Sequence, residues 1–223
     1  MMFELSPSLS AGSQLNLGEV LNRTRELSHI HLDVDDGNFV HEITFGMDTV
    51  ATVARNTDVP LDVHLEVLNP MDYVRPLCEI GVSAACAHVE ALPFPSEFLS
   101  ALRRGGIEKI GLAINLKTPV DEILSYADQL DYVIFVSVEA DSDGLPFRPM
   151  TLEKVRRARE AFGDRVQLWV DGGVNETNLP DVIRAGADAV VVGRAVFGQD
   201  DPIAAARRIE KIGNDCLAEC GRA

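Results

Sequence analysis

The chain has 223 residues, of which 46% are hydrophobic and 25% charged, and this composition is that of a globular protein rather than a disordered or fibrous one. Its formal net charge of −15 at pH 7 argues against nucleic acid and anionic membrane surfaces as partners, because both would repel it. We see neither a run of about 18 apolar residues nor a signal-peptide pattern at the start. The expected location is therefore the cytoplasm.

Eight short segments along the chain are apolar and rich in β-branched residues. They cover residues 3–5, 30–34, 61–67, 85–89, 110–114, 132–138, 166–170 and 189–192. Stretches with helical spacing lie between them, and Pro70, Pro119 and Pro202 mark the first turns of three helices. Continuous apolar strands that alternate with helices indicate a parallel sheet buried on both faces. The sequence thus predicts an α/β fold, a single-domain (β/α)8 barrel over residues 1–223, with an open doubly wound sheet as the alternative.

Four metal-binding or acid–base side chains stand at the ends of three of these segments. They are His31, Asp33, His64 and Asp171. Because the carboxyl ends of parallel barrel strands meet at one face, we expect these side chains to converge. Two imidazoles and two carboxylates suit Zn²⁺, with Mn²⁺ or Fe²⁺ as alternatives. Two carboxylates on opposite sides of a substrate could remove a proton from one face and return it to the other, which indicates epimerisation.

Glycines follow the seventh and eighth predicted strands. Gly172 and Gly173 end the seventh, and Gly193 precedes Arg194 at the end of the eighth. In barrels, the loops at these two places often hold a phosphate through backbone N–H groups, and an arginine can add a bidentate contact. The alternative is that the glycines only form tight turns.

The whole chain resembles the ribulose-phosphate 3-epimerase family. The resemblance begins at Ser6-Pro7-Ser8 and includes His31-Leu32-Asp33-Val34, Asp62-Val63-His64-Leu65 and Val170-Asp171-Gly172-Gly173. Further matching stretches are residues 36–40, 43–46, 60–61, 69–70, 88–91, 111–115, 118–119 and 185–188.

This resemblance implies a set of functional residues. One divalent metal ion per subunit would be held by His31, Asp33, His64 and Asp171, of which the two aspartates would also carry the protons. The resemblance further implies a substrate contact by Ser8 and a phosphate cradle that includes Gly172, Gly173 and Gly193. The implied reaction is inversion at C3 of a ketose phosphate through a metal-bound enediolate, typically ribulose 5-phosphate to xylulose 5-phosphate. Such relatives are homo-oligomers, commonly dimers or hexamers.

Several positions depart from the family pattern. Asp35, Glu66 and Val136 replace three methionines that line the metal site, and we expect them to affect specificity. The family's substrate-covering loop, Pro-Gly-Phe-Gly-Gly-Gln, is replaced at residues 140–145, where Gly144 is a candidate phosphate contact. A carboxylate about 5 Å from an enediolate would cost roughly 3 kcal/mol. We therefore expect Asp35 and Glu66 to bind a different substrate or to be neutralised by nearby cations, with three candidates: Lys117, Arg148 and Arg194.

Two other functions remain open at this point. A phosphosugar lyase or decarboxylase could use the same barrel, but its Asp-x-Lys-x-x-Asp signature would require lysine where this chain has Asp35. A barrel that binds a sugar phosphate without turning it over is the other alternative, because the covering loop is altered.

Overall fold

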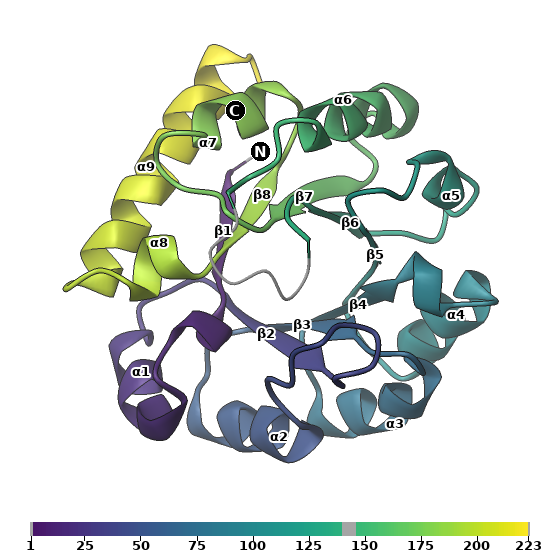
Figure 1. The fold of residues 1–223 in the computed structure, drawn as a ribbon, viewed down its shortest axis with the longest axis vertical. Helices are drawn as coiled ribbons and strands as arrows, with labels where there is room; N and C mark the ends of the chain where they lie inside the picture. Colours follow the sequence, from purple (N-terminus) through teal and green to yellow (C-terminus); the bar gives the residue numbers. More distant parts are fainter. Residues whose placement is uncertain (1, 140–145, 223) are drawn as a thin grey trace.

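The computed structural model of this protein describes residues 2–139 and 146–222. Its centre is one parallel sheet in the order β1-β8-β7-β6-β5-β4-β3-β2, and a parallel bridge between Ser8 and His31 joins its two edges (Figure 1). The strands are β1 (Glu4–Pro7), β2 (Ile30–Asp35), β3 (Leu61–Glu66), β4 (Ala84–His88), β5 (Lys109–Ile114), β6 (Tyr132–Val136), β7 (Gln167–Asp171) and β8 (Ala189–Val192). The predicted (β/α)8 barrel is confirmed.

Helices surround this ring of strands (Figure 1). They are α1 (Leu17–Arg23), α2 (Met47–Asn56), α3 (Met71–Ile80), α4 (Pro95–Arg104), α5 (Asp121–Leu124), α6 (Thr151–Phe162), α7 (Leu179–Arg184), α8 (Arg194–Phe197) and α9 (Pro202–Glu219), with 3-10 turns η1 (Leu9–Ala11), η2 (Gln14–Asn16) and η3 (Val89–Ala91). The start of α9 follows from its sequence: Pro202 fits the first turn, and the Asp201 side chain accepts the Ala204 N–H at 3.0 Å. In the described part of the chain, no helix is long and apolar enough to cross a membrane.

The strands are apolar on both faces because each face is covered. Their outward side chains, such as Leu32 and Val63, join the helices in one large core. The inward side chains of β4 to β8 form a second apolar cluster inside the barrel: Ala84, Cys86, Ala113, Tyr132, Ile134, Val136, Trp169, Ala189 and Val191. Strands β2 and β3 differ, because alternate side chains on each of them are ionisable. The polar groups of the barrel interior are therefore concentrated at β2 and β3.

Candidate metal centre

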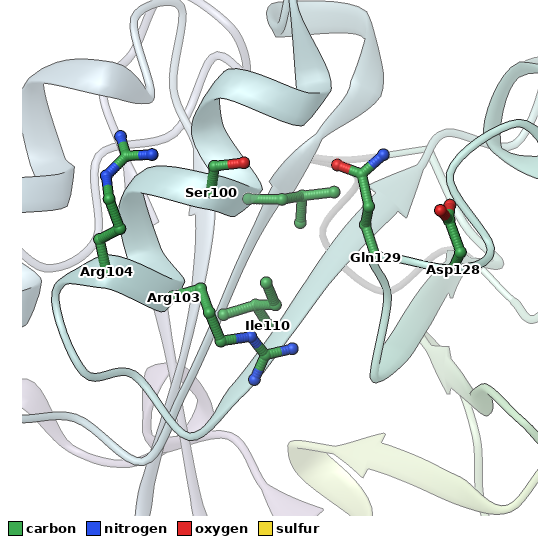
Figure 2. Close-up of a pocket in the computed structure, with 7 residues that line it drawn as sticks. Ser100, Arg103, Arg104, Ile110, Asp128 and Gln129 are labelled. Atoms are coloured by element: carbon green, nitrogen blue, oxygen red, sulfur yellow. The ribbon is translucent and has the colours of Figure 1, made fainter.

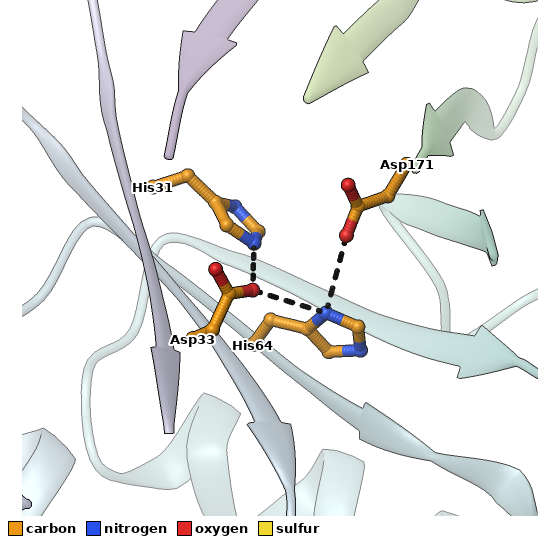
Figure 3. A group of neighbouring side chains, drawn as sticks. All are labelled: His31, Asp33, His64 and Asp171. Carbon is orange, nitrogen blue, oxygen red and sulfur yellow. Dashed lines mark hydrogen bonds and ion pairs between the residues drawn. The ribbon is translucent and has the colours of Figure 1, made fainter. Parts of the chain in front are cut away.

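The four predicted ligands come together in the barrel: His31 and Asp33 lie on β2, His64 lies on β3, and Asp171 ends β7 (Figure 3). Each offers one ligand atom, and these atoms all lie within 4.8 Å of one another. Strand register brings the first three together, since Asp33 pairs with His64 between β2 and β3, and His31 lies two residues before Asp33 on the same face. Asp171 ends β7 and faces the other three residues (Figure 3).

His64 is the ring that the two carboxylates share. Its Nδ1 lies 3.8 Å from Asp33 Oδ1 and 3.8 Å from Asp171 Oδ2. These distances are too long for hydrogen bonds, and both ring nitrogens are buried without a hydrogen-bond partner. A buried nitrogen that faces two carboxylates across such a gap fits a divalent cation, as does the chemistry of the whole N₂O₂ donor set.

The two carboxyl groups differ in their electrostatics. Burial alone would raise the pKa of Asp33, but the facing His31 and His64 and a hydrogen bond from Ser8 hold it well below its usual range. Burial raises the pKa of Asp171, and the nearby His64 and His31 only partly oppose this. The pair therefore combines an ionised carboxylate with one that takes up a proton more readily, which is how two similar groups serve as base and acid.

Two serines hold the Asp33 carboxylate. Ser8 Oγ donates to Asp33 Oδ2 at 2.6 Å, and Ser10 Oγ donates to the same oxygen at 3.0 Å. Ser8 was expected to contact substrate, and its hydroxyl lies here against a predicted ligand. Ser10 was missed, although its position two residues after Ser8, in the turn that follows β1, was a usable signal.

Asp35 and Glu66 are neutralised differently from our expectation. The Glu66 carboxylate faces His88 rather than lysine or arginine, with Oε1 3.1 Å from His88 Nε2, and Glu90 lies 3.2 Å from the other ring nitrogen. Although burial disfavours the imidazolium, these two carboxylates raise the pKa of His88 to about 9. Burial, with Glu66 and Asp33 nearby, raises the pKa of Asp35 to about 9, so its carboxyl is neutral at pH 7.

Lys117, Arg148 and Arg194 were the cations named for Asp35 and Glu66, and the basic group that the structure describes beside Glu66 is His88 instead. His88 reaches Glu66 because both side chains point into the barrel from the neighbouring strands β3 and β4. A histidine that ends an apolar strand next to the one carrying Glu66 was the signal available in the sequence.

The glycines after β7 are required by their own backbone and packing. Gly172 and Gly173 have φ values of +98° and +65°, which favour glycine. A Cβ on Gly172 would lie 2.6 Å from Val138 Cγ2, and one on Gly173 would lie 2.8 Å from the Phe147 nitrogen. These contacts account for the glycines as a tight turn, so phosphate binding by this turn stays a prediction.

The remaining predicted residues lie near the same end of the barrel. A Cβ on Gly193 would lie 2.8 Å from Ala11 Cβ, and Arg194 begins α8. Val136 is buried in the interior cluster, as the register partner of Asp171. Gly144 and the altered segment 140–145 lie outside the described residues.

Asp62 was not assigned a role from the sequence. It pairs in register with His31 across β2 and β3, and its Oδ1 contacts His31 Nδ1. Inward-facing Asp62, two residues before His64, was visible in the alternation of β3, but its partner depends on how the strands pair.

Two surface hollows lie away from this centre. One of about 350 Å³ is lined by Ser100, Arg103 and Arg104 of α4, with Gln129 opposite (Figure 2). The Arg103 guanidinium there is already bound to Asp131 Oδ2 at 2.7 Å and to the Glu108 carbonyl at 2.8 Å. The other hollow, of about 600 Å³, is lined by residues that precede β2 and β3. Neither hollow includes a predicted site residue.

Comparison with known proteins agrees with the residue pattern. The sequence profile of the ribulose-phosphate 3 epimerase family matches residues 4–197. The ribulose-phosphate 3-epimerase of Bacillus subtilis is 34% identical over 206 residues, which cover 90% of this chain and 94% of the relative. The cytoplasmic isoform of this enzyme from rice, Oryza sativa subsp. japonica, is 30% identical, with 89% of each chain covered. Among solved structures, orotidine 5'-phosphate decarboxylase from Pyrococcus horikoshii is similar in fold, with a TM-score of 0.68 at 16% identity, covering 94% of this chain and 98% of that one.

Proposed function

Because the chain belongs to the ribulose-phosphate 3-epimerase family and is thus a carbohydrate epimerase, we propose that it is a metal-dependent 3-epimerase of a ketose phosphate. The substrate pair is ribulose 5-phosphate and xylulose 5-phosphate or a related sugar phosphate. The observation that carries this proposal is the convergence of His31, Asp33, His64 and Asp171 at one end of the barrel.

One divalent metal ion per subunit belongs to this site in the proposal, with Zn²⁺ as the first choice and Mn²⁺ or Fe²⁺ as alternatives. His31, Asp33, His64 and Asp171 would hold it. When bound, such an ion polarises the ketose carbonyl and stabilises the negative charge that develops after C3 loses its proton. The orphaned nitrogens of His64 support this assignment.

Asp33 and Asp171 are the proton carriers in this proposal. They approach His64 Nδ1 from different strands, β2 and β7, and are drawn on either side of it in Figure 3. One carboxylate removes the C3 proton from one face of the substrate, and the other carboxyl group returns a proton to the opposite face. Ser8 and Ser10 hold Asp33 Oδ2, which fixes the orientation of that carboxylate during both half-reactions.

The phosphate end of the substrate is assigned to the loops after β7 and β8. Gly172, Gly173 and Gly193 allow a close approach of the backbone, and Arg194 supplies a positive charge at the start of α8. This charge matters because the chain as a whole carries −15 and does not attract an anion.

Asp35, Glu66 and Val136 are assigned to substrate selection. They occupy positions close to the proposed ligands, and two of them, Asp35 and Glu66, bring carboxyl groups to the barrel interior. The Oδ1 atom of Asp35 is buried without a hydrogen-bond partner. A buried oxygen of this kind favours a substrate that offers it a hydroxyl group. The preferred sugar phosphate is therefore one whose hydroxyl groups reach β2 and β3.

The test is turnover of a panel of pentulose and hexulose phosphates by protein loaded with Zn²⁺ or Mn²⁺. We expect inversion at C3 of at least one member, and we expect Glu66→Met to change the ratio of kcat/KM between ribulose 5-phosphate and the hexulose phosphates. Binding of a sugar phosphate from the panel, without inversion of any member, would indicate a sugar-phosphate-binding protein instead of an epimerase. Cleavage or decarboxylation of a member would indicate a lyase.

We expect the protein in the cytoplasm, which the name of the rice relative states for that protein, and cell fractionation tests this.

A further inference from the structure

Asp62 is a buried carboxylate to which the proposed reaction gives no role. It is 1% exposed, and its two oxygens are both engaged: Oδ1 contacts His31 Nδ1, and Oδ2 accepts a hydrogen bond from Ser6 Oγ. His31 and Ser6 are equally buried, at 0% and 1% exposed. An ionised carboxylate removed from water in this way costs free energy unless its partners compensate it, so its presence requires an explanation.

The three residues come from three strands that follow one another around the barrel. Ser6 lies on β1, His31 on β2 and Asp62 on β3. His31 and Asp62 are register partners, and β1 approaches β2 through the bridge between Ser8 and His31. The chain of contacts from Ser6 through Asp62 to His31 is thus set by strand pairing, and it ends on a residue of the proposed metal centre.

When a cation occupies the position in front of Nε2, the contact with Asp62 determines that the remaining hydrogen of His31 is on Nδ1. A carboxylate only accepts hydrogen bonds, so Nδ1, which faces Asp62, must be the N–H of the ring. The other nitrogen, Nε2, faces the cluster and lies 2.9 Å from Asp33 Oδ1. A neutral imidazole whose hydrogen is on Nδ1 has its lone pair on Nε2, which is the form that binds a metal there.

His64 is held in a different way. Its ring stacks on His88, with centroids 4.9 Å apart and planes 16° from parallel, and neither of its nitrogens has a hydrogen-bond partner. The protein therefore fixes one proposed imidazole ligand by a carboxylate and the other by ring packing.

We propose that Asp62 and Ser6 are positioning residues for metal binding: Asp62 keeps the hydrogen of His31 on Nδ1 and aims Nε2 at the cation, and Ser6 orients the Asp62 carboxylate. This inference rests on the metal site of the proposed function. It goes beyond that function in assigning two residues that touch neither the metal nor the substrate.

The test is zinc affinity of the full-length protein, measured by competition with a chromophoric chelator. We expect Asp62→Asn to weaken zinc binding by roughly 10- to 100-fold, the usual effect of losing such an outer partner. Ser6→Ala leaves the carboxylate in place and should weaken binding by about 2- to 10-fold, the effect of one lost hydrogen bond. Asp131→Asn is the matched control, since Asp131 binds Arg103 and the Ile110 N–H at the opposite end of the strands, and it should leave zinc affinity unchanged.

A second readout reports the ring itself. Nitrogen NMR of the zinc-loaded parent should show hydrogen on His31 Nδ1, and Asp62→Asn should change this signal. Parent protein that binds no zinc would refute the proposed metal site, and this inference with it. Parent protein that binds zinc, with Ser6→Ala and folded Asp62→Asn binding it equally well, would overturn the positioning role alone. If Asp62→Asn does not fold, the zinc affinity of Ser6→Ala and the NMR signal of His31 in the parent still test the positioning role.

Discussion

At the residue scale, the unusual feature of this barrel is that carboxyl groups occupy its interior beside the proposed metal ligands. Asp35 carries a proton at pH 7, and Glu66 is paired with His88. Both arrangements remove negative charge that would otherwise oppose the formation of an anionic intermediate. The acidic substitutions therefore oppose enediolate chemistry less than two free carboxylates would, because Asp35 is protonated and His88 offsets part of the charge of Glu66.

Glu90 gives a pH-dependent prediction at this scale. The facing His88 and hydrogen bonds from Thr118 and the Asn115 N–H outweigh burial and lower the pKa of Glu90 to about 2, from an ordinary value of 4.5. Because the folded-state pKa is lower, ionised Glu90 contributes stability above pH 4.5, and this contribution is lost as the pH falls toward 2. We expect Glu90→Gln to lower the free energy of unfolding by ~1–2 kcal/mol at pH 7, with a difference from the parent that narrows below pH 4.5.

Urea unfolding at pH 7, 5 and 3 measures this difference. Glu153→Gln, at an ion pair whose Glu153 side chain is 80% exposed, is the control and should change the free energy of unfolding by less than about 0.5 kcal/mol. A Glu90→Gln effect that is the same at pH 7 and pH 3 would show that ionised Glu90 does not stabilise the fold.

The sequence allowed some of these residues to be predicted and not others. His31, Asp33, His64 and Asp171 could be grouped because each was placed on or directly after a predicted strand, and in a parallel barrel such side chains meet at one face. The contacts of Asp62 with His31, and of Glu66 with His88, depend on register between neighbouring strands, which periodicity within one segment does not fix.

At the element scale, the predicted strands match the observed ones within about two residues, because each contains an apolar, β-branched run that packs against the helices. The first strand was placed too early, at residues 3–5 instead of Glu4–Pro7, because its later residues include inward-facing Ser6, which binds Asp62. The sixth was extended to residue 138, whereas β6 ends at Val136 and the next carbonyl, that of Ser137, accepts the Arg148 N–H at 2.9 Å. The first strand was thus shortened at a polar residue with a buried partner, and the sixth was lengthened through residues whose backbone leaves the sheet.

The packing of α9 on the start of β1 supplies an element-scale prediction. A Cβ on Gly213 would lie 2.2 Å from Phe3 Cδ1, and the neighbouring Asn214 accepts the Phe3 N–H at 3.1 Å. Gly213→Ala should therefore lower the free energy of unfolding by ~1–3 kcal/mol, since the buried Phe3 ring must move.

Gly18 of α1 is the matched control. A Cβ there would meet nothing within 4 Å, so Gly18→Ala should leave stability unchanged or raise it by ~0.5–1 kcal/mol. Thermal unfolding of both variants measures the effect. Equal stability of Gly213→Ala and the parent would show that α9 does not pack tightly on Phe3.

At the scale of the whole molecule, the proposed site and a second set of buried ion pairs lie at opposite ends of the barrel. The proposed site is formed by residues of β2 and β3 and by Asp171, which ends β7. At the amino-terminal ends, buried Asp188 contacts Arg159 of α6 and Arg222, which follows α9, and Lys109 lies 3.1 Å from Glu4. We propose that residues 1–223 form one domain, because these contacts join the last helix, α6 and the strands.

Apolar loops next to the site support the proposal of a homo-oligomer. Ile43, Leu68 and Phe94 follow β2, β3 and β4, and they are 77%, 50% and 71% exposed. A second copy of the chain would cover such side chains. We expect light scattering to give a mass that is a multiple of 24.3 kDa.

Phe94→Asp should reduce that mass at micromolar concentration. The control is Leu15→Asp, at a side chain that is 96% exposed in η2, and it should leave the mass unchanged. A parent that stays at 24.3 kDa at all concentrations would contradict the proposed oligomer.

The most direct test of the central claim, that Asp33 and Asp171 exchange the C3 proton at the His31–His64 centre, is deuterium uptake from D₂O into C3 of ribulose 5-phosphate or of the best substrate in the panel. With metal in excess, the account predicts uptake in both epimers by the parent and by Asp131→Asn, and a loss of at least about 10²-fold in Asp33→Asn and in Asp171→Asn. Full uptake in either of these two variants would contradict the account, as would no uptake from any ketose phosphate by the metal-loaded parent.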